Sequence, residues 1–300
     1  MHLRTRHQRA AVAATTFLAH ACATTTLVLL PAHLVLDQGL GPLAYAVLVG
    51  LAAAVHLLTT PVGRYLTSRS PGRLGIVRPG SSAASLATAV AAFSTDFVPI
   101  ACALVLGVAA LAGSRPAWRS LAEASAATDT ARRGARSGCF VGLASALAAS
   151  TLPDGLGLGL RLGAGVGGLA LVVLVTSVED RRAPLAPRRS VTPAHWRRAL
   201  EVAEVRTAAT LGAVTSTVLA GATIAWVAGV GTGSDSTRAA CAVALSWLCY
   251  GAVRHVLGER AGGAVTDGLR QSARDVVEAA LLVGVVAAAS VAGVSVRVLG

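Results

Sequence analysis

Long apolar stretches separated by short polar segments run along the whole chain. Nine of them have about the length that an α-helix needs to cross a bilayer, roughly 20 residues. They cover residues 11–35, 41–62, 75–95, 97–114, 137–152, 156–177, 207–230, 237–257 and 277–297. The stretches have almost no polar face, which the helices of a soluble bundle would need. The pattern therefore predicts an all-α, polytopic membrane protein.

Arginine alternates along the polar segments in step with these stretches. The N-terminal tail and the segments after the second, fourth, sixth and eighth stretches hold most of the arginines, whereas the intervening segments are short and hold almost none. Because positively charged loops stay in the cytoplasm, the alternation supports nine crossings. It predicts a multi-pass protein of the cell membrane with a cytoplasmic N-terminus and a C-terminus outside.

Composition agrees with a membrane location and narrows the possible functions. Hydrophobic residues make up 54% of the 300 residues and charged residues only 13%, whereas a soluble protein has about 25% charged residues. The formal net charge of +12 is compatible with nucleic-acid binding, but the arginines lie in short loops, so we expect no nucleic-acid partner. The bias towards Ala, Gly, Val and Arg is typical of a GC-rich bacterial genome, which favours the inner membrane.

The sequence carries no motif for catalysis or metal binding. It has no HExxH, no GxSxG and no phosphate-binding loop. The five cysteines lie within apolar stretches and form no CxxC pair, so we interpret them as packing residues. We therefore expect no enzyme activity, no cofactor and no metal site, and a lipid bilayer as the main partner.

One longer segment, Ser177–Arg206, is rich in proline and arginine and divides the chain unequally. We expect an N-terminal six-helix membrane bundle over 1–177, a cytoplasmic central loop over 178–206 and a C-terminal three-helix membrane segment over 207–300. Within the loop, Thr192-Pro193 predicts the start of a short amphipathic helix that lies along the membrane face.

Two loops rich in arginine and glycine follow the second and the eighth stretch. The first reads GRYLTSRSPGRLG from Gly63 and the second reads HVLGERAGG from His255. Both resemble the signature loop G-x-L-[A/S]-D-R-x-G-R of the major facilitator superfamily, although the first has looser spacing and Ser68 at the aspartate position. Leu66 and Leu257 also match. The resemblance implies that these loops clasp the two halves of the protein in one conformation, so we call them the clasp loops. The matching residues are Gly63, Arg69, Gly72, Arg73, Glu259, Arg260 and Gly262.

This resemblance implies both a fold and a function. Six helices, a basic central loop and further helices are similar to the layout of that family, with an incomplete C-terminal bundle, because its members usually have twelve helices. The resemblance implies that the chain moves a small solute by alternating access. Because helices are missing, an alternative remains: a truncated or accessory membrane protein that does not transport. Separately, we expect that a second copy or a partner chain can supply the missing helices.

The candidates for solute binding are ionisable or aromatic side chains inside the stretches, where such groups are usually functional. Each has a structural alternative: a histidine can bond to a neighbouring helix, an arginine can reach the outer surface, and an aromatic ring can anchor at the interface. His33 and Asp37 lie four residues apart on one helix face and can pair. The candidates are His20, His33, Asp37, Arg161, Trp226, Trp247 and Tyr250.

Two further ionisable residues inside the stretches are interpreted as structural. We expect His56 to pack or to lie at the interface. We expect Glu278 to pair with Arg274, which lies four residues earlier on the same helix. Because so few carboxylates lie inside the apolar stretches, the sequence argues against coupling to protons.

Overall fold

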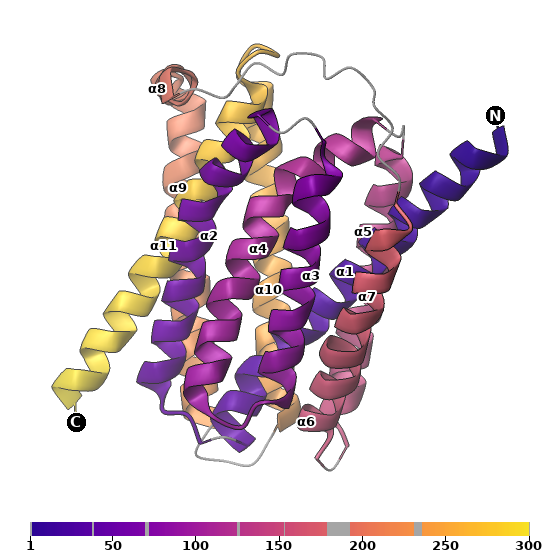
Figure 1. Ribbon diagram of the computed structural model, residues 1–300. Coiled ribbons are helices and arrows are strands. Elements are labelled where there is room, and N and C mark those ends of the chain that lie inside the picture. The colour runs from indigo at the N-terminus through magenta and orange to yellow at the C-terminus, as the bar shows by residue number, and fades with distance from the viewer. Residues whose placement is uncertain are drawn as a thin grey trace. The chain divides into compact units, whose positions relative to one another are not determined.

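The fold consists of helices throughout the part of the chain that the computed structural model describes, which is residues 2–37, 39–69, 72–124, 127–152, 154–178, 193–230 and 236–299 (Figure 1). Two of the helical segments, η1 and η2, are π-helical. In order the elements are α1 (His2–Ala32), η1 (His33–Asp37), α2 (Pro42–Arg69), α3 (Leu74–Phe93), α4 (Phe97–Ala124), α5 (Thr128–Ser150), α6 (Gly155–Leu160), η2 (Arg161–Val166), α7 (Gly167–Thr176), α8 (Pro193–Glu201), α9 (Ala203–Val230), α10 (Ser236–Gly263) and α11 (Arg270–Leu299). The predicted all-α fold is confirmed.

Each of the nine predicted stretches falls on a helical segment. Among the described residues, seven helices are long and apolar enough to cross a membrane, and α3 and α5 are not among them. The helix α3 carries Arg78 and several hydroxyl side chains, while α5 begins with three arginines and continues mainly in small residues. Seven crossings are therefore supported, and nine remain a prediction.

Several helices extend beyond the predicted apolar stretches. The helix α4 continues past Arg115 and Pro116 to Ala124, and α5 begins at Thr128. Arginine and alanine are good helix formers, so a polar segment continues the helix although it is too polar for the bilayer core. Proline also occurs inside α1, α2, α3 and α4. Membrane helices tolerate proline because neighbouring groups form hydrogen bonds with the backbone carbonyls that it leaves unpaired.

The chain divides into two compact units. Unit 1 comprises Met1–Gly39, Leu58–Arg188 and Asp235–Cys241, and unit 2 comprises Leu40–Leu57, Arg189–Ser234 and Ala242–Gly300. The first half of α2 belongs to unit 2, where a Cβ added at Gly50 would lie 2.8 Å from Cβ of Ala289 in α11. The division into 1–177, 178–206 and 207–300 remains a prediction, and residues 179–192 of its central loop lie outside the described part.

Close packing of α1 against α5 organises unit 1. Three glycines of α5, one per helical turn, face the backbone of α1. A Cβ at Gly134 would lie 2.6 Å from the carbonyl oxygen of Ala13, and one at Gly138 would clash with the carbonyl oxygen of Phe17. Gly142 faces the carbonyl oxygen of Ala21 in the same way. Small residues at this spacing let two membrane helices approach until their backbones touch.

A second row of glycines, Gly159, Gly163 and Gly167, faces side chains of α1. The row follows α6, η2 and α7 through the glycine-rich stretch GLGLGLRLGAGVGG. A Cβ at Gly163 would lie 2.6 Å from Cγ2 of Thr25, and one at Gly167 would lie 2.6 Å from Sγ of Cys22. The row therefore serves helix packing.

The helix α8 closes one end of the core of unit 2. Ala199 of α8 is buried in an apolar cluster with residues of α9, α10 and α11, and Trp196 packs against the same cluster. Arg197 and Arg198 on the opposite side of α8 are exposed. The amphipathic helix expected after Thr192-Pro193 therefore exists, and Ala199 and Trp196 face the core of unit 2. Its position along the membrane face remains a prediction.

Candidate functional site

The first clasp loop lies between α2 and α3 and joins helix ends within unit 1. Gly63 sits where α2 passes α4, since a Cβ there would clash with the backbone of Gly113. Arg73 is only 9% exposed, and its Nε donates a hydrogen bond to Oγ of Ser120 in α4 at 2.8 Å. The carbonyl of Arg73 accepts the first backbone hydrogen bonds of α3. Arg73 thus ties the start of α3 to α4.

The other matched positions of this loop are more open. Arg69 is exposed, and its guanidinium lies 4.7 Å from the centroid of the Tyr65 ring, a cation–π contact one turn along α2. Ser68, at the aspartate position, donates to the Tyr65 carbonyl at 2.8 Å. Gly72 is half-buried directly before Arg73. The serine therefore bonds within its own helix.

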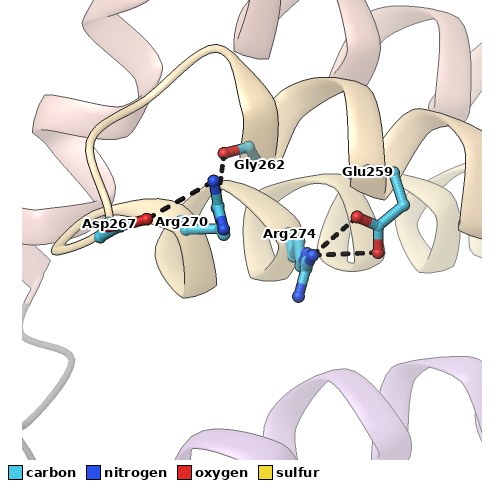
Figure 2. A network of polar contacts seen from close by, with 5 residues as sticks. All are labelled: Glu259, Gly262, Asp267, Arg270 and Arg274. Atoms are coloured by element: carbon cyan, nitrogen blue, oxygen red, sulfur yellow. Dashed lines mark hydrogen bonds and ion pairs between the residues drawn. The ribbon is translucent and has the colours of Figure 1, made fainter.

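The second clasp loop joins α10 to α11 within unit 2 (Figure 2). Nη2 of Arg274 donates to both carboxylate oxygens of Glu259, at 2.9 and 2.8 Å. Nε of Arg270 donates to the carbonyl of Gly262 at 3.2 Å, and Nη2 of Arg270 lies 3.4 Å from the carboxylate of Asp267. Glu259, predicted from its place in the loop, thus has an arginine partner across the turn.

Gly262 is the residue that lets the arginines of α11 lie this close to α10. A Cβ there would lie 3.1 Å from Cγ of Arg270 and 3.1 Å from Nε of Arg274, which is tighter than nine in ten Cβ contacts in proteins. Arg260 is exposed in the last turn of α10, where a positive charge is favourable beside the helix C-terminus.

The predicted solute-binding residues of unit 1 lie in different surroundings. His20 is exposed on α1, and its Nδ1 lies 2.8 Å from the carbonyl oxygen of Thr16 one turn earlier. His33 is 6% exposed and packs against α6, where a Cβ at Gly157 would lie 3.6 Å from its Cε1. Arg161 is exposed at the start of η2. Asp37 ends η1, and its side chain lies outside the described part of the chain, as does its pairing with His33.

Two of the three aromatic candidates of unit 2 meet. The rings of Trp247 and Tyr250 on α10 are nearly parallel, with centroids 6.1 Å apart and planes 9° apart. Nearby on the same helix, Ser246 accepts a hydrogen bond from Oγ1 of Thr223 in α9 at 2.6 Å. Trp226 on α9 is 53% exposed and Trp247 is 38% exposed. The stacked pair and the hydroxyl pair thus lie on one stretch of α10, and Tyr250 also packs against the buried apolar cluster of unit 2.

A cluster that sequence reasoning missed lies between α2, α10 and α11 in unit 2. Nη2 of Arg254 lies 3.1 Å from Oε2 of Glu278, and Nε2 of His56 lies 3.7 Å from Oε1 of the same carboxylate. Glu278 was expected to pair with Arg274, but Arg274 contacts Glu259 instead. His56, expected to pack or lie at the interface, faces a carboxylate. The signal in the sequence was three ionisable residues inside apolar stretches.

Metal binding has no visible basis in the described residues, where no three His, Cys, Asp or Glu side chains gather closely enough to hold an ion. The described residues instead hold ion pairs near helix ends, a charge cluster between α2, α10 and α11, and a stacked aromatic pair.

Comparison with known proteins identifies the fold. No protein-family model and no curated protein sequence matches the chain. Among solved structures, the nucleoside transporter NupG matches with a TM-score of 0.67 and 9% identity over 98% of this chain and 92% of that one. A point mutant of NupG matches with a TM-score of 0.68. A bacterial homologue of the human lysosomal transporter Spinster, inward-facing and unoccupied, matches with a TM-score of 0.62 and 14% identity over 98% of this chain and 78% of that one. The chain therefore has the helical fold of these solved transporters, and its long apolar helices support a multi-pass membrane protein.

Proposed function

We propose that this protein moves a small solute across a membrane by alternating access. The observation that carries the proposal is the agreement of 97–98% of the chain with the folds of solved transporters. The division into two compact units supports it as well, because alternating access needs two bodies that rock about a shared site. Since these neighbours are transporters and not enzymes, the proposal includes no catalysis.

The orientation we propose follows the arginines. The two clasp loops and α8 lie on the cytoplasmic side of a bacterial inner membrane, the N-terminus is cytoplasmic, and nine crossings leave the C-terminus outside. The ion pair between Glu259 and Arg274 and the hydrogen bond from Arg73 to Ser120 each act inside one unit. In this proposal the clasp residues keep each unit rigid while it rocks. A second copy or partner that completes the helices remains part of the proposal.

For the solute we propose an amphipathic organic molecule. In unit 2 the stacked rings of Trp247 and Tyr250 would contact its apolar part, and the hydroxyls of Thr223 and Ser246 would bond its polar part. The remaining candidates, which are exposed or lie near helix ends, would contact the solute along its path: His20, His33, Asp37, Arg161 and Trp226.

Uptake by proteoliposomes tests the proposed function. The first probe is radiolabelled uridine, because one fold neighbour is a nucleoside transporter, and a panel of amphipathic solutes follows, chosen by their effect on thermal stability of the purified protein. We expect saturable uptake that falls about fivefold to tenfold in Trp247→Ala, since an aromatic contact can supply about 1 to 1.5 kcal/mol. Phe140→Ala, which removes an exposed ring on α5, is the matched control and should leave uptake unchanged.

A well-folded chain that leaves every solute at the leak rate of protein-free liposomes would contradict transport. That result would favour the alternative of a non-transporting accessory membrane protein.

A further inference from the structure

Three ionisable side chains from distant parts of the sequence converge inside unit 2. The Glu278 carboxylate of α11 lies between the Arg254 guanidinium of α10 and the His56 imidazole of α2, at 3.1 and 3.7 Å. The side chain of Glu278 is 18% exposed and that of His56 is 26% exposed. Each of the three residues belongs to a helix long and apolar enough to cross a membrane. Such residues inside membrane helices are commonly functional.

The charge of this cluster depends on a single proton. Arginine stays protonated in proteins, and one ionised carboxylate balances it. With a neutral imidazole the cluster therefore has no net charge, and one further proton gives it a charge of +1 wherever that proton resides. Histidine is the side chain whose charge ordinarily changes between about pH 5 and 8. The proton and the carboxylate form one coupled site, so its titration belongs to the pair.

Charged groups on the surrounding helices are engaged elsewhere. On α11, Arg274 donates to Glu259, and Asp275 accepts a hydrogen bond from Gln271 at 2.8 Å. In α9 the stretch 207–230 contains no ionisable residue. Of the charged groups near His56, Glu278 attracts a proton, and Arg254, which contacts Glu278, repels one.

We propose that His56, Glu278 and Arg254 form a proton-binding site. A proton from water is taken up on Nε2 of His56 and donated towards Oε1 of Glu278, while Arg254 holds the carboxylate in place through Oε2. Protonation turns the contact between α2 and α11 into a charge-assisted ion pair, which is stronger than the neutral contact. The site lets unit 2 respond to pH, because protonation strengthens the contact that holds the first half of α2 on α11. This proposal differs from the sequence-based expectation, which argued against coupling to protons. It does not depend on the identity of any solute.

The test is histidine NMR of the full chain in lipid nanodiscs without solute. With ¹⁵N-labelled histidine, imidazole shifts separate the neutral and protonated forms between about pH 5 and 8, and the signal lost in His56→Gln identifies His56. We expect this signal to titrate and its proton affinity to fall about tenfold or more in Glu278→Gln, because a charge within 4 Å is removed. His255→Gln removes an exposed neighbour of Arg254 and is the matched control that should leave the His56 titration unchanged.

A second variant keeps the test decisive if Glu278→Gln fails to fold. The double variant Arg254→Gln with Glu278→Gln leaves no unpaired charge in the cluster, and His56 should bind a proton more weakly there than in the wild type. A His56 signal that does not titrate, or one that titrates identically in the wild type and in either variant, overturns the proposal. Because the assay contains no solute, its failure is distinct from a failure to transport.

Discussion

Substituting Gly138 with alanine tests the packing of unit 1 most sharply. This glycine lies in the middle of the row on α5 that faces α1, and an added Cβ would clash with the carbonyl oxygen of Phe17, with the Phe17 carbonyl carbon at 3.0 Å and its Cα at 3.1 Å. These are backbone atoms, so no side-chain rotation relieves the clash and the two helices must separate. Separation also loosens the contacts at Gly134 and Gly142 one turn away on each side.

The expected cost follows from two opposing effects. Overpacking of this kind costs about 1–3 kcal/mol, and contact with backbone places it in the upper part of that range. Alanine favours the helix over glycine by about 1 kcal/mol, which offsets part of the loss. We therefore expect Gly138→Ala to lower the free energy of unfolding by about 1–2 kcal/mol.

The measurement is equilibrium unfolding in bicelles by steric trapping, with Gly113→Ala as the matched control. Gly113 also lies inside a helix of unit 1, but nothing lies within 4 Å of a Cβ built there, so this change should be neutral or slightly stabilising. Equal stability of the two variants would refute the interpretation of the glycine row as a backbone contact.

Three further predictions concern polar contacts. Arg274→Gln breaks a half-exposed ion pair, so the free energy of unfolding should fall by less than about 1 kcal/mol, and a larger fall in the same assay would show that the pair is poorly screened. Ser120→Ala removes the acceptor of the Arg73 Nε–H in a buried place, which should cost about 1–3 kcal/mol; a stability equal to wild type would contradict this contact. His56→Gln should abolish any dependence of solute uptake on a pH gradient across proteoliposomes while His255→Gln preserves it, and a retained dependence in His56→Gln would exclude that role.

The sequence predicted helix positions well because hydrophobicity is a local property. All nine apolar stretches fall on helices. Helix ends were predicted less well, as in α4, which continues to Ala124. Arginine marks where the apolar stretch ends, but it continues a helix readily, so the end of an apolar stretch and the end of a helix differ.

Side-chain partners were the hardest feature to predict. Glu278 was paired with Arg274 by the spacing of one helix, yet its partners Arg254 and His56 come from two other helices. The hydrogen bond from Arg73 likewise reaches Ser120, 47 residues along the chain. Sequence spacing describes neighbours on one helix, whereas these contacts depend on how helices pack, which no single-helix rule contains.

The most direct test of alternating access measures whether the two units move relative to each other in a lipid bilayer. Spin labels at Gly75→Cys in unit 1 and Gly263→Cys in unit 2 would occupy exposed positions with nothing within 4 Å of an added Cβ, in a chain whose five native cysteines are replaced. A second pair within unit 1, at Gly75 and Arg133, serves as the rigid control. Alternating access predicts two populations of distance between the units, with a ratio that changes when a transported solute is added, and one population for the control. A single distance between the units that no solute changes would contradict alternating access.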